Sequence, residues 1–174
     1  MTGDIVLRDV IADDLPIFFE QQLDPEATRM AAFPSRDWEP FLKHWTKILG
    51  DDSLVKQTIL FGGKVAGNIV VFGPADEREV GYWLGKPYWG KGIATRALEA
   101  LLLGVTDRPL YAQVAKHNAA SVRVLQKCGF RIVGEESGVD VGGIIADELT
   151  LKLGGDDMVP AERETDAVTR RLFS

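Results

Sequence analysis

A glycine-rich turn between a strand-like run and a helix-like run constrains the fold of this chain most. Residues 79–84 are rich in β-forming side chains, and Tyr88-Trp89-Gly90-Lys91-Gly92 follows. Apolar residues then recur at helical spacing over 93–104. Such a turn leaves unpaired backbone N–H groups at a helix start, where the helix dipole also favours an anion. The pattern predicts a phosphate-binding unit, with a turn that serves only packing as the alternative.

Two common phosphate-binding motifs fit this turn poorly. The Walker pattern requires Gly-Lys-Ser/Thr at the helix start, whereas Lys91 is followed by Gly92. The dinucleotide-binding pattern requires a small third residue where Thr95 stands. It also requires an acidic residue for a ribose, and residues 110–116 contain none. A nucleotide-dependent oxidoreductase of the Rossmann kind is therefore disfavoured.

The order of the remaining patterns predicts an α/β (α+β) fold. The predicted strands cover residues 5–7, 55–61, 65–72, 79–84, 110–114, 130–135 and 144–153. The predicted helices begin near Asp13 or Asp14, Trp38, Ile93 and Asn118. We expect one domain over residues 1–153, with a mixed, mostly antiparallel, twisted sheet flanked by helices. The polar segment 154–174 is expected to be a tail outside the core.

Composition narrows the range of functions. A chain of 174 residues fits one domain, and 45% hydrophobic with 26% charged residues is typical of a folded soluble protein. One cysteine and two histidines disfavour a disulfide framework and a metal site. The net charge of −6 argues against a nucleic-acid partner and suits a cationic or amine partner. No run approaches the roughly 18 apolar residues of a membrane span, and the first residues do not resemble a signal peptide. We expect no membrane partner and a cytoplasmic location.

Four sequence blocks, in this order, resemble the GNAT superfamily of acetyl-CoA-dependent N-acetyltransferases. The blocks are Glu79-Val80-Gly81-Tyr82-Trp83-Leu84, Tyr88-Trp89-Gly90-Lys91-Gly92-Ile93-Ala94-Thr95, Asn118-Ala119-Ala120-Ser121 and Lys127-Cys128-Gly129-Phe130. The resemblance extends over about residues 4–153 and is greatest to the ribosomal-protein N-terminal (Rim-type) acetyltransferase branch. It implies a GNAT-like domain that uses acetyl-CoA as the acetyl donor.

The resemblance also implies which residues bind the donor. The pantetheine arm would pair like an extra strand with Tyr82, Trp83 and Leu84. The pyrophosphate would lie over backbone N–H groups of Trp89, Gly90, Lys91, Gly92, Ile93, Ala94 and Thr95. Asn118 would approach the pantetheine amides, although capping the following helix is an equally physical role.

Acetyl transfer to an amine requires a neutral amine, a donor to the developing oxyanion and a proton for the departing thiolate. By the resemblance, Ser121 protonates the thiolate, Glu79 lies where family members place a base, and the N–H of Trp83 or Leu84 contacts the oxyanion. A locally satisfied serine, a solvated edge glutamate and catalysis by water are the alternatives.

The acceptor is expected to be a primary amine, either a peptide or protein N-terminus or a small molecule, that attacks directly in a ternary complex. Four aromatic residues are candidates for its pocket, with core packing as the alternative: Phe33, Trp38, Trp45 and Trp83. A non-catalytic acetyl-CoA-binding sensor is the second hypothesis for the function. A homodimer is compatible with the family.

Overall fold

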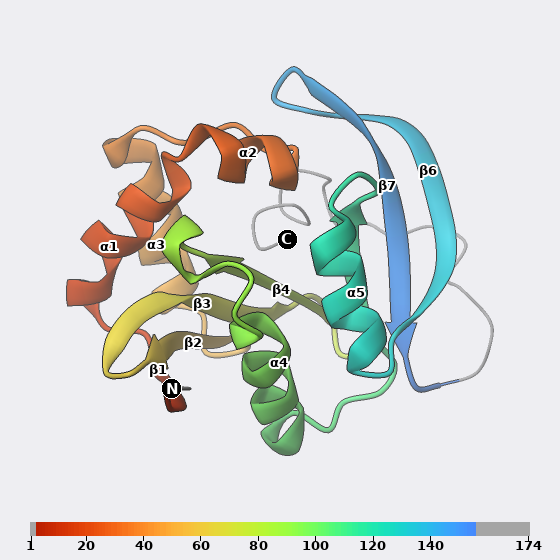
Figure 1. Ribbon diagram of the computed structural model, residues 1–174, viewed down its shortest axis with the longest axis horizontal. Coiled ribbons are helices and arrows are strands. Elements are labelled where there is room, and N and C mark those ends of the chain that lie inside the picture. The colour runs from red at the N-terminus through yellow and green to blue at the C-terminus, as the bar shows by residue number, and fades with distance from the viewer. Residues whose placement is uncertain (1–2, 156–174) are drawn as a thin grey trace.

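Seven strands form one mixed sheet in the computed structural model, which describes residues 3–155 (Figure 1). In chain order they are β1 (Ile5–Asp9), β2 (Val55–Phe61), β3 (Lys64–Phe72), β4 (Glu79–Leu84), β5 (Leu110–Ala115), β6 (Arg131–Val141) and β7 (Ile144–Leu153). Their order across the sheet is β1-β2-β3-β4-β5-β7-β6. Only the β4–β5 pair of these neighbours is parallel. The predicted mixed, mostly antiparallel sheet is confirmed.

Five α-helices flank the sheet within residues 3–155. They are α1 (Leu15–Gln22), α2 (Pro25–Ala31), α3 (Trp38–Leu49), α4 (Ile93–Gly104) and α5 (Ala119–Lys127). The helices α4 and α5 lie in front of the sheet in Figure 1 and pack on the core face that includes Ile69 and Leu151. The helices α1 and α3 pack on the opposite face, against Val70 and Phe72. Because side chains alternate along a strand, neighbouring residues of β3 serve two separate hydrophobic clusters.

The helix α2 was not predicted from the sequence. Asp24 caps it by accepting hydrogen bonds from the backbone N–H groups of Glu26 (2.9 Å) and Ala27 (3.1 Å). Pro25 occupies the first helical position, where a missing N–H costs nothing. The Asp-Pro-Glu sequence was therefore a usable start signal, but seven residues show too few apolar repeats to reveal a helix.

The last hairpin is longer than predicted. The strand β6 continues to Val141, so the segment 137–143, expected as a loop, lies largely within it. Gly142 and Gly143 alone make the turn, with φ angles of 59° and 89°. Two irregularities in the β6–β7 register absorb extra residues, and such bulges disturb the alternating pattern that the sequence prediction used. Beyond Gly155, the expected tail lies outside the described residues.

The parallel strands β4 and β5 diverge soon after they meet. Their registered pair is Glu79 with Tyr111, whereas β4 stays paired with β3 as far as Leu84. Past Glu79, the β5-facing edge of β4 therefore has no registered neighbour among the described strands. A strand edge of this kind presents backbone N–H and C=O groups that a ligand can pair with.

Gly67 on β3 fixes how closely β3 and β4 approach at the end of that edge. A Cβ atom at this position would overlap the carbonyl oxygen of Trp83. Any side chain would push the end of β4 away, so only glycine allows this approach.

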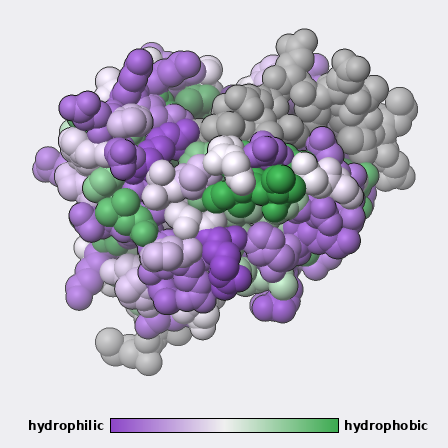
Figure 2. All heavy atoms as spheres, turned by 90° about the horizontal axis from the view of Figure 1, so that it is seen from above, coloured by the Kyte–Doolittle hydropathy of each residue, from purple (hydrophilic) through white to green (hydrophobic). Residues whose placement is uncertain are grey.

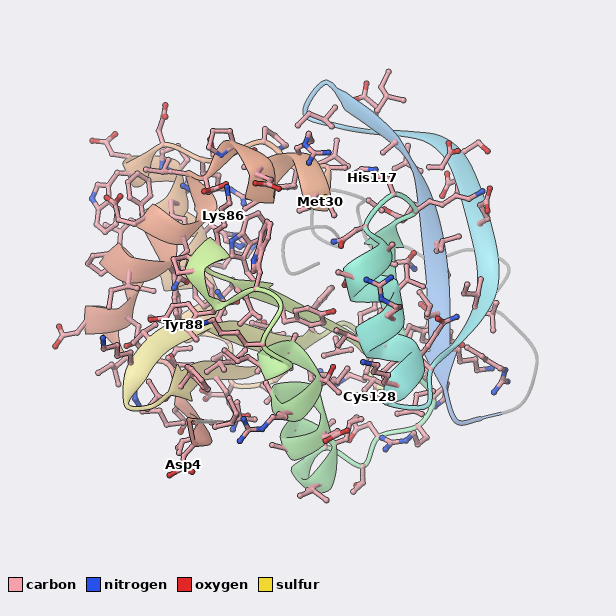
Figure 3. The ribbon with its side chains drawn as sticks, viewed as in Figure 1. Asp4, Met30, Lys86, Tyr88, His117 and Cys128 are labelled. Carbon is pink, nitrogen blue, oxygen red and sulfur yellow. The ribbon has the colours of Figure 1, made fainter. Side chains whose placement is uncertain are left out.

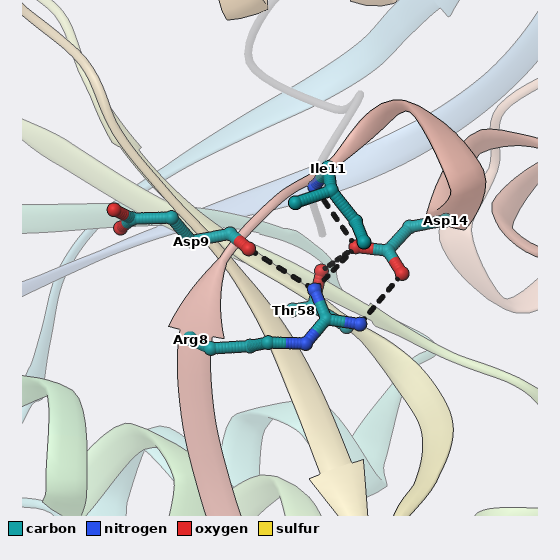
Figure 4. Close-up of polar contacts among 5 residues, drawn as sticks. All are labelled: Arg8, Asp9, Ile11, Asp14 and Thr58. Carbon is teal, nitrogen blue, oxygen red and sulfur yellow. Dashed lines mark hydrogen bonds and ion pairs between the residues drawn. The ribbon is translucent and has the colours of Figure 1, made fainter.

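A buried carboxylate anchors the start of the chain to the sheet (Figure 4). Asp14 is 2% exposed and accepts two hydrogen bonds from the Arg8 guanidinium, at 2.7 and 2.8 Å. The Thr58 hydroxyl (2.6 Å) and the Ile11 N–H (3.0 Å) donate to the same carboxylate. Burial acts to raise the pKa of Asp14, but these hydrogen bonds outweigh it and hold the pKa below its ordinary value.

This network occupies the Asp14 side chain at the start of α1. Asp14 directly precedes α1, as expected, but its side chain makes no capping hydrogen bond to that helix. Ile17, expected on the apolar face of α1, is 41% exposed. None of the helices in the described part of the chain has the length and apolar character of a membrane span.

The surface of the described chain is largely hydrophilic on the face that Figure 2 shows, with apolar side chains gathered in small patches. Leu103 on α4 and Ile145 on β7 are the most exposed of the large apolar residues. They lie on different elements, and single exposed apolar side chains of this kind are ordinary in folded proteins.

Candidate active site

A cavity of about 380 Å³ lies against β4, the glycine-rich turn and the starts of α4 and α5. Its wall includes ten of the eleven residues predicted to bind the donor, namely Tyr82, Trp83, Leu84, Trp89, Gly90, Gly92, Ile93, Ala94, Thr95 and Asn118. The predicted proton donor, Ser121, also lines it. Lys91 is exposed and does not. Met30 of α2 and Tyr88, both labelled in Figure 3, also line the cavity.

The turn before α4 presents backbone donors to this cavity. Gly90 and Gly92 have φ angles of 71° and 74°, in the left-handed region that glycine adopts without strain. Gly92 precedes the helix and supplies no side-chain cap. The first hydrogen bond within α4 runs from the Arg96 N–H to the Gly92 carbonyl. The N–H groups of residues 93–95 are therefore available at the positive end of the helix dipole, which suits a phosphate.

The open edge of β4 forms another side of the same cavity. Tyr82, Trp83 and Leu84 lie on this strand beyond its contact with β5. The Trp89 indole N–H donates to the Leu84 carbonyl at 3.0 Å, so this side chain holds the turn against the strand end. An extended ligand can thus meet strand-like backbone groups and the α4 terminus in one cavity.

Ser121 and Tyr82 form a close hydroxyl pair in the wall. The Ser121 Oγ and the Tyr82 hydroxyl oxygen lie 2.6 Å apart, and either can donate. The two residues are 7% and 9% exposed. Burial raises the pKa of Tyr82, which keeps its hydroxyl protonated and able to donate. The sequence interpretation gave Tyr82 only a backbone role and missed this contact, which depends on how α5 packs on β4.

Asn118 caps α5, and its Oδ1 accepts a hydrogen bond from the Ser121 N–H at 3.3 Å. This confirms the capping role. Because Asn118 also lines the cavity, its carboxamide is placed where a ligand can meet it.

Glu79 is buried rather than solvated, but it does not line the cavity. It is 1% exposed and begins β4, three residues before Tyr82. That separation is about 10 Å along a strand, and the two side chains point to opposite faces of the sheet. The Glu79 carboxylate is therefore not part of the cavity wall, although the resemblance places Glu79 where family members have a base.

Two cations that the sequence interpretation missed lie on α5. Arg123 and Lys127 line the cavity and are exposed. They are four residues apart, so both project from one face of the helix. Two cations four residues apart, in the helix that Asn118 caps, could have been read from the sequence as a cationic helix face. In a chain of net charge −6, they provide local attraction for anionic groups of a ligand.

Two other reactive side chains have structural partners. Cys128 Sγ lies 3.7 Å from the Thr95 carbonyl oxygen, and burial raises the pKa of its thiol to about 11, so little nucleophilic thiolate forms. His117 is exposed at the start of α5 (Figure 3), where its Nε2 donates to the Arg29 carbonyl at 2.7 Å. Neither arrangement requires a catalytic role.

A second, smaller cavity of about 30 Å³ adjoins the first through Trp83, which lines both. Of the four aromatic residues predicted for an acceptor pocket, Phe33, Trp45 and Trp83 line this cavity. Trp38 does not; it is 39% exposed and packs against Phe41 with ring centroids 6.1 Å apart.

Comparison with known proteins identifies the family. A model of the acetyltransferase (GNAT) domain matches residues 4–131. An uncharacterized N-acetyltransferase p20 from Bacillus licheniformis is 28% identical over 147 residues, which are 76% of this chain and 82% of that protein.

Solved structures share the fold. Spermidine N-acetyltransferase from Vibrio cholerae, in complex with CoA and spermine, matches with a TM-score of 0.75 and 16% identity over 86% of this chain and 94% of that one. A putative acetyltransferase from T. thermophilus matches with a TM-score of 0.68 and 27% identity, over 85% and 84% of the two chains. The family match spans most of the chain and includes the β4 edge, the turn and the Ser121 helix. The chain therefore belongs to the GNAT family of acetyl-CoA-dependent acetyltransferases.

Proposed function

We propose that this protein transfers the acetyl group of acetyl-CoA to a primary amine by direct attack in a ternary complex. The observation that carries the proposal is one cavity that combines the open edge of β4, the uncapped start of α4 and the Ser121–Tyr82 hydroxyl pair. A linear thioester with a pyrophosphate at its far end needs all three.

Backbone groups bind most of the donor. The N–H groups of residues 93–95 hold the pyrophosphate, and the β4 edge pairs with the pantetheine arm. The Asn118 carboxamide meets a pantetheine amide, while Arg123 and Lys127 attract the phosphates. Lys91 contributes through its main chain only, because its side chain lies outside the wall.

The reacting thioester lies at the end of β4. The amine nitrogen attacks the acetyl carbonyl carbon, and the N–H of Trp83 or Leu84 donates to the developing oxyanion. As the carbon–sulfur bond breaks, Ser121 gives its hydroxyl proton to the thiolate and takes one from Tyr82 across the 2.6 Å contact. Water gives a proton to Tyr82 within the same transfer, because burial disfavours the phenolate.

The amine must lose a proton before or during attack. An α-amino group has a pKa of about 7.7 to 8.0, so a fraction is already neutral near pH 7 and water suffices as the base. We assign this step to water because Glu79 does not reach the cavity wall. The alternative base is Glu79 acting through intervening water. The Glu79→Gln variant distinguishes the two bases: it changes the pH profile of kcat/KM if Glu79 is the base and leaves the profile unchanged if water is.

The acceptor is a small-molecule amine or a peptide N-terminus, and the latter is the acceptor that the Rim-type resemblance favours. The Vibrio cholerae enzyme with a similar fold is named for spermidine, which supports an amine but not one particular class. A panel of amines and short peptides, tested with acetyl-CoA for thiol release and for the mass of the product, decides between them.

A sensor that binds acetyl-CoA without turnover is the competing function. Thermal melts with acetyl-CoA, NAD and ATP at equal concentration test the donor site, since a ligand at about a hundred times its Kd stabilises the fold by roughly 2.7 kcal/mol. Stabilisation by acetyl-CoA alone together with an acetylated amine supports the enzyme. Stabilisation without any acetylated product supports the sensor, and stabilisation by NAD instead contradicts both.

A further inference from the structure

The small cavity beyond Trp83 is lined by charged and polar side chains as well as aromatic ones. Arg36, from the segment between α2 and α3, and Asn68 of β3 both line it. Its volume of about 30 Å³ accommodates about two oxygen-sized atoms. Trp83 lines both this cavity and the donor cavity, so the two cavities are neighbours and a carboxylate held in one lies near the other.

The Arg36 guanidinium lacks a counter-ion among the described residues. It lies over the Phe33 ring, 4.9 Å from the centroid, and no described carboxylate pairs with it. Burial lowers the pKa of Arg36. Burial, followed by the charges of Arg36 and Lys47, lowers the pKa of the neighbouring His44 to about 4, so the imidazole is neutral near pH 7. A partly buried cation without an anion gains most from an anionic ligand.

Asn68 provides a second, independent indication of a ligand. It is 5% exposed, and its Oδ1 accepts no hydrogen bond from the described residues. Asn68 lies directly opposite Trp83 in the β3–β4 register, so both side chains lie on the same face of the sheet. A buried carbonyl oxygen without a donor costs free energy that an N–H group of a ligand recovers.

The segment that carries Arg36 is held in place before any ligand binds. The Gln22 side chain pairs with the Arg36 backbone in both directions. Its Nε2 donates to the Arg36 carbonyl at 3.0 Å, and its Oε1 accepts from the Arg36 N–H at 2.7 Å. A receptor fixed in this way loses little conformational entropy on binding.

We propose that Arg36 and Asn68 form an acceptor subsite for a carboxylate with a nearby N–H group, so that the preferred acceptor is an amine of the α-amino acid type. This inference rests on the proposed amine acetylation. The planar guanidinium matches the two oxygens of a carboxylate, and Asn68 Oδ1 accepts from an N–H of the same molecule. The acidic net charge favours amines in general, whereas this cavity selects those that also carry a carboxylate.

Matched pairs of acceptors test the subsite by kinetics. At saturating acetyl-CoA, CoA release is measured with L-amino acids and with the corresponding amino acid amides, which lack the negative charge. We expect higher kcat/KM for the acids in the wild type. Arg36→Gln lowers kcat/KM for the acids about 10- to 100-fold, the usual effect of losing a charge-assisted hydrogen bond, and leaves the amides unchanged. Arg29→Gln removes a cation from an exposed site on α2 and serves as the control.

Equal rates for acids and amides in the wild type, or an equal loss for both in Arg36→Gln, would overturn the subsite while leaving the acetyltransferase intact. Thermal melts with CoA plus each amino acid or amide test binding without turnover. The subsite is supported if an amino acid adds stabilisation to the wild type and its amide does not. This added stabilisation should be lost in Arg36→Gln and in Asn68→Asp, while acetyl-CoA alone still stabilises both variants. That result supports the subsite even if no product forms. Absence of added stabilisation by every amino acid refutes it.

Discussion

Removal of the Ser121 hydroxyl is the most direct test of how the thiolate receives its proton. In Ser121→Ala the Tyr82 hydroxyl remains but loses the partner 2.6 Å away. Loss of a positioned general acid lowers kcat by about 10²- to 10⁴-fold. In Tyr82→Phe the direct donor is retained and only its proton source is lost, so we expect a smaller decrease.

Both changes also weaken the fold, and that effect must be separated from catalysis. Each removes the hydroxyl–hydroxyl hydrogen bond, and Tyr82→Phe also removes a longer bond to the Ser121 carbonyl (3.5 Å); the cost is about 1 to 2 kcal/mol of unfolding free energy. Ile59→Val is a suitable control, because Ile59 is fully buried in the same core on β2 and its truncation costs about 0.5 to 1.5 kcal/mol. This control should melt at a lower temperature but retain kcat.

The assay measures initial rates of CoA release at saturating acetyl-CoA and amine, well below each variant's Tm. The double variant Ser121→Ala/Tyr82→Phe should be no slower than Ser121→Ala, because the proton relay is already interrupted. Wild-type kcat in Ser121→Ala would refute the relay. So would a decrease in kcat that Ile59→Val reproduces.

Three further predictions concern the scaffold and the donor site. Gly67→Ala should lower the unfolding free energy by about 3 kcal/mol in urea titrations, because its Cβ meets the backbone of β4, whereas Gly104→Ala, with no atom within 4 Å, should not. Hydrogen bonds hold the Asp14 pKa below its ordinary value in the folded protein. The ionised Asp14 therefore stabilises the fold fully above the pKa of about 3.9 that it has in the unfolded chain, and this contribution is lost as the pH falls through the lower pKa of the folded protein. Asp14→Asn should lose about 2 kcal/mol at pH 7 and show a shallower acid-induced decline; an unchanged decline contradicts this. Arg123→Gln and Lys127→Gln should each raise the Kd for acetyl-CoA and reduce its salt dependence in titration calorimetry, and an unchanged salt slope argues against phosphate contacts.

Local signals were sufficient to predict the glycine-rich turn and the start of the helix that follows it. The glycines at 90 and 92 adopt the positive φ angles that the turn requires, and the helix after them begins at the expected residue. Backbone-mediated binding is readable from sequence because it depends on where a strand ends and a helix begins. Lys91 is not among the residues that line the cavity, but the prediction concerned its backbone N–H group and stays a prediction.

Features that depend on tertiary packing were missed or misplaced. The Ser121–Tyr82 contact joins residues 39 positions apart, and no local pattern reports it. The resemblance places Glu79 where family members have a base, but three residues along a strand put its side chain on the face opposite Tyr82, so a role as the base stays a prediction. The extended β6 was missed because bulges break the two-residue period.

The shared position of Trp83 has a thermodynamic consequence for the order in which substrates bind. Its indole N–H donates to the Gln21 carbonyl at 3.3 Å, and the residue lines both cavities. If a ligand in one cavity displaces Trp83, we expect the other cavity to change shape, which would couple the two binding free energies. Such coupling is reciprocal: the factor by which bound donor increases the affinity for the acceptor equals the factor by which bound acceptor increases the affinity for the donor. Through this one shared residue, we expect the donor and the acceptor to bind cooperatively.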